Sequence, residues 1–320
     1  MKSIDVIEGE LALCEAEIPS VGPNDILIKV KSTAINRADL MQKKGLYPPP
    51  PGASEILGLE CSGIVDLVGE KVTSRKVGDE VCALLAGGGY AEYVACPEFQ
   101  AIPKPTNLNW EEASSLPEVY ATCWLNLFME GKLSNNNKVL FHAGASGIGT
   151  AGIQLCNAFK CESFVTVGTK EKIQFCKNLG ASEGAVRGEK MFDEVRDWVS
   201  DGFDLILDPV GANYFEENLK VLGLEGRLII IGLMGGLESK INLGHLMMKR
   251  QRIIGSTIRA RSEELKKIVM RDLHEKVWPF IESNEIQPII YEVFSMSEVE
   301  RAHQVMEHNE NIGKIVLTLV

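Results

Sequence analysis

The sequence predicts an α/β protein of two domains: a β-rich domain built from both ends of the chain, and a doubly wound parallel sheet between them. Three observations support this. Short apolar segments separated by glycine and proline fill the first part of the chain, apolar and helical segments alternate in the middle, and an apolar segment ends it at 315–320. A terminal strand needs a sheet to pair with, so we expect residues 1–118 and 262–320 to form one domain and 119–261 the other.

The first domain begins with segments that alternate in polarity, or run apolar, at strand length. Ile26–Ala34, Gly63–Val68 and Tyr90–Ala95 are the clearest, and turn residues separate them. After them, Asn109 followed by Glu112 has the spacing of a capping box and predicts the start of a helix.

The middle of the chain alternates between strands and helices. We predict strands near 138–143, 163–167, 184–186, 203–208, 227–232 and 252–257. The tail is mixed, with helix over 262–283, a strand over 289–294, and a last helix that Ser297 and Glu300 open with a second capping box.

Composition excludes several classes of function. The net charge of −11 argues against a nucleic-acid or anionic-membrane partner, and the 320 residues contain no apolar stretch of membrane-spanning length. The first residues show no signal or transit pattern, so we expect a cytoplasmic protein. The eight cysteines form no C-x-x-C pair, which favours free thiols and disfavours a zinc site.

The strongest motif is a glycine turn between a predicted strand and a predicted helix. The apolar run 138–143 leads into Gly144, Gly147 and Gly149, and 150–159 has helical spacing. Such a turn places backbone N–H groups and the positive end of a helix against a diphosphate, which predicts a dinucleotide site. The alternative is a turn that only allows tight packing of strand on helix.

The end of the second strand indicates which dinucleotide binds. An NAD enzyme usually carries a carboxylate there, about 20 residues past the glycines, for the ribose 2′-OH. Here the position is Gly168, followed by Thr169, Lys170 and Lys172, with Arg187 after the third strand. Hydroxyl and cationic groups without a carboxylate favour a 2′-phosphate, and therefore NADPH over NADH. The alternative is that the lysines form a solvated helix face.

Several blocks resemble the medium-chain dehydrogenase/reductase superfamily in its quinone oxidoreductase, zeta-crystallin-like branch. They are Asn36–Asp39, Gly58–Gly63, Val77–Val81, Gly88–Glu92 and the glycine turn. Tyr47–Gly52, Leu57–Glu60, Gly232–Gly236 and Asn311–Val316 are most similar to the tumour-suppressor-inducible quinone oxidoreductase group. The resemblance covers nearly the whole chain. It implies a discontinuous GroES-like catalytic domain, a Rossmann domain and a homodimer.

The sequence departs from the zinc alcohol dehydrogenases of this superfamily at their metal ligands. Asn36 stands where they have a cysteine and Leu59 where they have a histidine, and the cysteine-rich lobe is missing between 87 and 109. The resemblance therefore implies a zinc-free member, in which an electron-poor acceptor such as a quinone takes the hydride without a Lewis acid.

The resemblance also assigns residues to the cofactor. The diphosphate contacts are Gly144, Ser146, Gly147, Ile148 and Gly149, and the 2′-phosphate pocket is Gly168, Thr169, Lys172 and Arg187, the last replacing a tyrosine of close relatives. The nicotinamide side is Thr122, Gly232, Leu233, Met234, Gly235, Ile258, Arg259, Ala260 and Asn311.

On the acceptor side the candidates are Asn36 and Tyr47, together with Thr122 from the cofactor side. The amide of Asn36 could hydrogen-bond a ribose or an acceptor oxygen. Tyr47 could stack on a flat ring or donate a proton to a developing oxyanion, or it could be a loop aromatic that packs on the prolines beside it.

Three further polar residues have structural interpretations. For Asp39 and Glu60 we favour a structural salt bridge, with Arg37 as the candidate partner, over general-base catalysis. His142, on the strand before the glycine turn, is interpreted as a hydrogen-bonded core histidine.

The resulting prediction is an NADPH-dependent quinone oxidoreductase that transfers hydride to a quinone in the interdomain cleft. Two alternatives remain: an NADPH-dependent enone or 2-enoyl thioester reductase, and a nucleotide-binding redox sensor or structural protein with little turnover.

Overall fold

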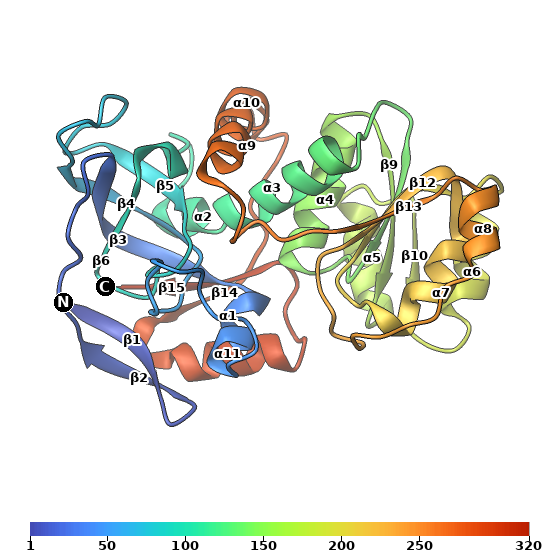
Figure 1. Cartoon of the computed structure of the whole chain (residues 1–320), viewed down its shortest axis with the longest axis horizontal. Helices are drawn as coiled ribbons and strands as arrows, with labels where there is room; N and C mark the ends of the chain where they lie inside the picture. Colours follow the sequence, from blue (N-terminus) through green and yellow to red (C-terminus); the bar gives the residue numbers. More distant parts are fainter. Residues whose placement is uncertain (320) are drawn as a thin grey trace. The chain divides into compact units, whose positions relative to one another are not determined.

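The computed structural model describes residues 1–319. The chain forms two compact units (Figure 1): unit 1, Met1–Ala121 with Ile258–Val320, and unit 2, Thr122–Thr257. These bounds differ by a few residues from 1–118, 262–320 and 119–261.

Unit 1 is built on a seven-stranded sheet in the order β14-β15-β3-β4-β5-β7, with β6 also paired to β3. Its strands are β3 (Asp25–Ile35), β4 (Glu60–Val68), β5 (Glu80–Leu84), β6 (Tyr93–Pro97), β7 (Ala101–Pro103), β14 (Ile290–Ser295) and β15 (Lys314–Thr318). β1 (Lys2–Ile7) and β2 (Glu10–Glu15) form a separate antiparallel pair.

The C-terminal strand joins the N-terminal sheet. β15 runs antiparallel to β3, with Ile315 opposite Ile35, and parallel to β14. Both Ile35 and Ile315 are fully buried. The prediction that the tail returns to the first domain is thus confirmed over the described part of the strand.

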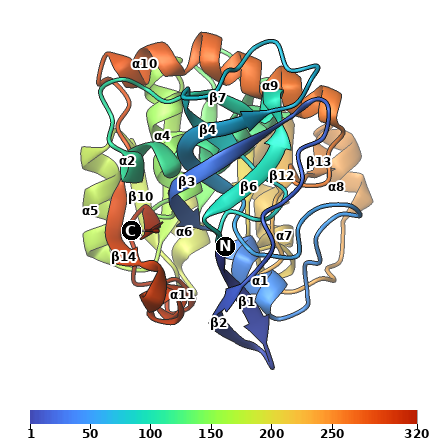
Figure 2. The ribbon, with the colours of Figure 1, turned by 90° about the vertical axis from the view of Figure 1, so that its left-hand side faces the viewer.

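Helices surround this sheet. They are α1 (Arg37–Lys43), α2 (Trp110–Ser114), α9 (Glu263–Lys276), α10 (Trp278–Glu282) and α11 (Val299–Glu307), with short 3₁₀ turns η1 (Glu98–Gln100) and η3 (Met296–Glu298). In Figure 2, α9 and α10 lie along one side of the unit, where α9 packs on β7. The indole of Trp278 donates to Pro103 O at 2.9 Å.

One predicted helix cap is correct and one is wrong. Asn109 and Glu112 exchange the two hydrogen bonds of a capping box, at 2.8 and 2.9 Å. The last cap consists of Ser295 and Glu298, because the turn η3 precedes α11. Glu300 instead pairs with Lys43 of α1.

Unit 2 is a doubly wound α/β domain. Its six strands are all parallel, in the order β10-β9-β8-β11-β12-β13. They are β8 (Lys138–His142), β9 (Glu162–Val167), β10 (Glu183–Val186), β11 (Phe203–Asp208), β12 (Leu222–Ile230) and β13 (Arg252–Gly255). The strand order reverses beside β8, and nucleotides bind at the carboxyl ends of strands at such a switch point.

Helices cover both faces of the parallel sheet. They are α4 (Gly147–Ala158), α5 (Lys170–Asn178), α6 (Met191–Trp198), α7 (Ala212–Val221) and α8 (Leu243–Met248), and α3 (Pro117–Cys123) and the π-helix η2 (Trp124–Glu130) precede β8. β8 is buried from Val139 to His142, as its apolar run predicts. A Cβ on Gly152 of α4 would lie 2.3 Å from the Phe141 ring, so glycine there permits the close packing of helix on sheet.

No helix within residues 1–319 combines the length and apolar character needed to cross a membrane.

Candidate active site

The glycine turn lies between the end of β8 and α4, as predicted. Ser146 is the N-cap of α4, and its Oγ accepts from Gly149 N at 3.1 Å. Gly147 and Ile148 are the first two helical residues, whose amides have no acceptor within an α-helix. These N–H groups fit a diphosphate.

Glycine is required in this turn for space. A Cβ on Gly144 would lie 2.4 Å from Val165, and one on Gly149 would lie 2.2 Å from Gly144 O. Both distances are far below van der Waals contact, so a side chain at either position would force the turn apart. The backbone can therefore form the close cradle that a dinucleotide needs.

Two residues predicted for a 2′-phosphate, Gly168 and Arg187, lie beside each other at the ends of β9 and β10, and Thr169 and Lys172 follow at the start of α5. Gly168 follows β9, and a Cβ placed on it would lie 3.0 Å from Arg187 Nη2. Arg187 is held there by its amide, which donates to Val167 O at 2.8 Å. Thr169 caps α5 through its Oγ1, which accepts from Lys172 N at 3.3 Å. An exposed guanidinium thus lies beside a strand end that has no carboxylate.

The loop Gly232–Gly235, predicted for the nicotinamide side, is held by the turn after β11. Met234 N donates to Pro209 O at 3.3 Å and Gly235 N to Val210 O at 2.7 Å. Leu233 and Met234 themselves are about half exposed. The loop therefore has a fixed backbone and two accessible apolar side chains.

A buried network joins the ends of β8, β9 and β11 to α7. His142 Nδ1 is 2.8 Å from Thr166 Oγ1 and its Nε2 is 2.7 Å from Asn218 Oδ1. Asn218 Nδ2 donates to Asp208 Oδ2 at 3.0 Å, and Asp208 Oδ1 accepts from Val210 N at 2.6 Å. Burial lowers the pKa of His142 to about 4, so it is a neutral core histidine, as expected from its position. No motif in the sequence marks Asp208, whose pKa burial raises to about 6.

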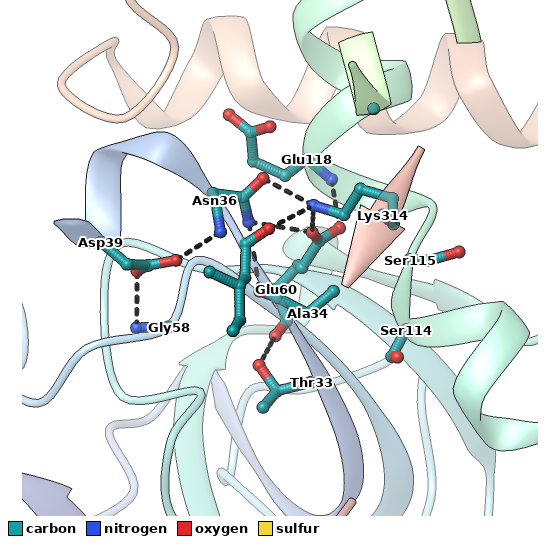
Figure 3. Close-up of polar contacts among 12 residues, drawn as sticks. Thr33, Ala34, Asn36, Asp39, Gly58, Glu60, Ser114, Ser115, Glu118 and Lys314 are labelled. Atoms are coloured by element: carbon teal, nitrogen blue, oxygen red, sulfur yellow. Dashed lines mark hydrogen bonds and ion pairs between the residues drawn. The ribbon is translucent and has the colours of Figure 1, made fainter. Parts of the chain in front are cut away.

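In unit 1, Asn36 belongs to a buried cluster with Glu60 and Lys314, here called the Lys314 cluster (Figure 3). Lys314 Nζ donates to Asn36 Oδ1 and to Glu60 Oε1, both at 2.7 Å. Asn36 Nδ2 donates to Glu60 Oε1 at 2.9 Å and to Ala34 O at 3.3 Å. Both N–H groups of this amide are therefore engaged within the protein.

The expected pairing with Arg37 is wrong. Glu60 pairs with Lys314. Arg37 instead donates to Met306 O and to Asn309 Oδ1, at 2.8 and 2.9 Å. Lysine is seldom buried, so no sequence pattern indicated that Lys314, near the end of the chain, would reach Glu60.

The Asp39 side chain holds two backbone segments together. Its carboxylate accepts from Asn36 N at 2.7 Å and from Gly58 N at 3.0 Å, and burial raises its pKa to about 6. Gly58 has φ +101°, and a Cβ there would lie 2.6 Å from Tyr90 N. Asp39 thus ties α1 to a turn that only glycine can form.

Tyr47 lies beside Arg259. The guanidinium carbon is 5.4 Å from the Tyr47 ring centroid, and Arg259 donates to Ala86 O at 2.8 Å and to Gln42 Oε1 at 2.7 Å. Burial raises the pKa of the Tyr47 phenol, while the cation opposes that rise. Arg259, predicted on the nicotinamide side, is thus fixed by hydrogen bonds inside unit 1, and its link to Tyr47 was not foreseen.

The remaining predicted residues are divided between the units. Thr122 is the first residue of unit 2 and is buried; its carbonyl accepts from Asn126 Nδ2 at 2.8 Å. Ile258, buried, and Asn311, whose Nδ2 donates to Gly313 O at 2.7 Å, belong to unit 1.

Two protein-family models match the chain in the same order as its domains. "Alcohol dehydrogenase GroES-like domain" matches residues 22–106 and "Zinc-binding dehydrogenase" matches 147–275. The chain belongs to the medium-chain dehydrogenase/reductase superfamily. The predicted superfamily and fold class are therefore confirmed, while the closer match to the tumour-suppressor-inducible group stays a prediction.

The individual relatives described here share between 26% and 28% of their residues with this chain. A quinone oxidoreductase of Mus musculus is 27% identical over 308 residues, covering 94% of this chain and 91% of that protein. A synaptic vesicle membrane protein VAT-1 homolog of Danio rerio is 28% identical, and the match covers 94% of this chain but only 65% of that protein. A mycobacterial protein solved in complex with NADPH is 26% identical, with a TM-score of 0.88 and 99% coverage of both chains.

The name of one matching model implies zinc, but the residues present do not fit this metal. Among residues 1–319, no three His, Cys, Asp or Glu side chains are placed to hold a metal ion. Asn36 and Leu59 stand where the sequence resemblance places two metal ligands of the zinc alcohol dehydrogenases. The polar groups at this place, Asn36 and Glu60, already bind the ammonium of Lys314. An amide and a carboxylate engaged by a cation do not make a tetrahedral zinc site.

Proposed function

We propose that this protein is an NADPH-dependent quinone oxidoreductase that works without zinc. The observation that carries the cofactor preference is the Arg187 guanidinium beside Gly168, at a strand end without a carboxylate. The donor set around Asn36, which does not fit zinc, supports the choice of an electron-poor acceptor, as does the similarity to the mouse quinone oxidoreductase.

The residues of unit 2 bind the cofactor. Amides of Gly147 and Ile148 hold the diphosphate, and Arg187 with Lys172 neutralises the 2′-phosphate. The loop 232–235 supplies apolar contacts through Leu233 and Met234. NADPH, when bound, supplies the hydride.

The residues of unit 1 act on the acceptor. A quinone that receives a hydride becomes a hydroquinone anion, which needs one proton. We assign this donation to Tyr47 Oη, because a phenol is protonated at neutral pH and the Arg259 guanidinium, which lies over the Tyr47 ring, stabilises the phenolate that remains. Solvent then returns the proton to Tyr47. Asn36 does not donate to the acceptor, because its N–H groups already donate to Ala34 O and to Glu60. Its role is to support the arrangement of the side chains around it.

A steady-state assay tests the reaction. Oxidation of NADPH and of NADH is followed at the nicotinamide absorbance with ortho- and para-quinones, one enone and one 2-enoyl thioester. We expect quinone turnover with a strong preference for NADPH. Turnover of the thioester in place of quinones would replace this proposal with an enoyl reductase, and NADPH binding without turnover would favour a sensor or structural role.

We also propose that the enzyme is a cytoplasmic homodimer. β13 is an edge strand of the unit 2 sheet, and an unpaired edge can accept the same strand of a second copy. Exposed apolar side chains lie on the chain segment that precedes it, namely Leu237, Leu243, Met247 and Met248. The eight free cysteines suit a reducing compartment. Light scattering on the purified protein tests the dimer, and a monomeric mass would reject it.

A further inference from the structure

Lys314 is a buried lysine in which every ammonium proton has a protein acceptor. Its Nζ donates to Ile35 O at 3.0 Å, and to Asn36 Oδ1 and Glu60 Oε1 at 2.7 Å (Figure 3). The exposed fractions are 4% for Lys314, 0% for Glu60 and 7% for Asn36. A charge removed this completely from water must be paired and hydrogen-bonded, and here it is.

The ammonium determines which way the Asn36 amide faces. Asn36 Oδ1 accepts from Lys314, and its Nδ2 donates to Glu60 and to Ala34 O. A reversed amide would place NH₂ against the ammonium, and its oxygen against a carboxylate and a carbonyl. Since an ammonium only donates and an ionised carboxylate only accepts, the reversed orientation loses all three hydrogen bonds.

The cluster also reaches the helix that leads out of unit 1. The second oxygen of Glu60, Oε2, accepts from Glu118 N at 2.9 Å, in the first turn of α3. Lys314 on β15, Asn36 before α1 and Glu118 on α3 are therefore all fixed around one carboxylate.

We propose that Lys314 is a positioning residue of the enzyme: its ammonium is a resident cation that locks the Asn36 amide in one orientation. In that orientation the amide donates to Glu60 and to Ala34 O inside the protein. Asn36 therefore has no N–H group left to donate to a ligand carbonyl. The kinetic part of this inference rests on the proposed function; the orientation of the amide does not.

Two variants separate positioning from stability. Lys314→Met keeps an unbranched side chain of similar length but removes its charge. The Glu60 carboxylate is then buried without a counter-ion. Lys314→Met combined with Glu60→Gln is neutral, but either orientation of the Asn36 amide then finds partners, because a glutamine amide can both donate and accept. The control is Lys44→Met, which removes an exposed ion pair with Glu307 in the same unit.

The measurements are the melting temperature, the dissociation constant for NADPH, and kcat and KM for a quinone. We expect Lys314→Met to lower Tm by roughly 10 °C, and the double variant to recover most of this loss. NADPH binding is unchanged in both. The quinone kcat/KM of the double variant stays about tenfold below wild type, whereas a merely structural role predicts full recovery.

A spectroscopic measurement needs no turnover. In protein labelled with ¹⁵N-asparagine, the side-chain NH₂ signal of Asn36 is identified by its loss in Asn36→Leu. We expect slow proton exchange in wild type and at least about tenfold faster exchange in the double variant, because the amide is no longer fixed. Unchanged exchange together with wild-type kcat/KM in the double variant overturns the inference. Absence of quinone turnover in wild type refutes only the proposed function.

Discussion

Replacing Gly168 by aspartate is predicted to reverse the cofactor preference. The backbone of Gly168 is outside the left-handed region, and the nearest atom to an added Cβ is Arg187 Nη2 at 3.0 Å, the end of a flexible side chain. An aspartate therefore fits after a small movement of Arg187. Its carboxylate pairs with the guanidinium and takes the place of the 2′-phosphate.

The magnitude follows from the contacts that change. Losing one or two charge-assisted hydrogen bonds to the 2′-phosphate, with repulsion by the new carboxylate, costs about 3 kcal/mol, or roughly 150-fold in the dissociation constant of NADPH. A hydrogen bond from the ribose 2′-OH to the carboxylate improves NADH binding by about 1 kcal/mol, roughly fivefold. The preference therefore shifts by a factor between about 10² and 10³.

The assay is titration of each cofactor by isothermal calorimetry, with Gly168→Ala as the matched control. Alanine adds the same Cβ without the charge, so it reports the steric part alone, and we expect it to change the NADPH/NADH ratio by less than about fivefold. An unchanged ratio in Gly168→Asp would refute the 2′-phosphate assignment. An equal effect of alanine and aspartate would show that space, and not charge, decides the preference.

Three other predictions concern single side chains. Lys172→Glu weakens NADPH binding much more than NADH binding in the same titration, and an equal loss for both cofactors contradicts its place in the pocket. Tyr47→Phe lowers kcat for quinones at least about tenfold while the NADPH dissociation constant stays the same; a wild-type kcat removes Tyr47 as the proton donor. Burial raises the pKa of Asp208 in the folded state to about 6, so the folded protein holds a proton there that the unfolded chain has released. Its stability relative to Asp208→Asn therefore falls by about 2 kcal/mol as the pH rises from about 4 to about 6.5, measured by urea unfolding; a difference that does not change with pH contradicts this.

Much of the fold was predictable because it depends on patterns that are local in sequence. The glycine turn, the buried run of β8 and the missing carboxylate at Gly168 each follow from a few neighbouring residues, and the same turn appears between β8 and α4. The predicted cap of the last helix was wrong because two local patterns in the sequence are equivalent. Ser295 with Glu298 and Ser297 with Glu300 have the same spacing, so the local pattern does not choose between them. In the structure Ser295 and Glu298 form the cap, and Glu300 pairs with Lys43, which is distant in sequence.

The sequence by itself determined the two-domain α/β architecture and the dinucleotide turn, because strand periodicity, glycine and helix caps act over a few residues. Only the tertiary structure decided that Glu60 pairs with Lys314 and not with Arg37, that Arg259 lies beside Tyr47, and that the N–H groups of Asn36 are engaged. These contacts join residues far apart in the chain. Their partners are chosen by which side chains the sheet buries together, since a buried charge must find a counter-charge wherever the fold places one.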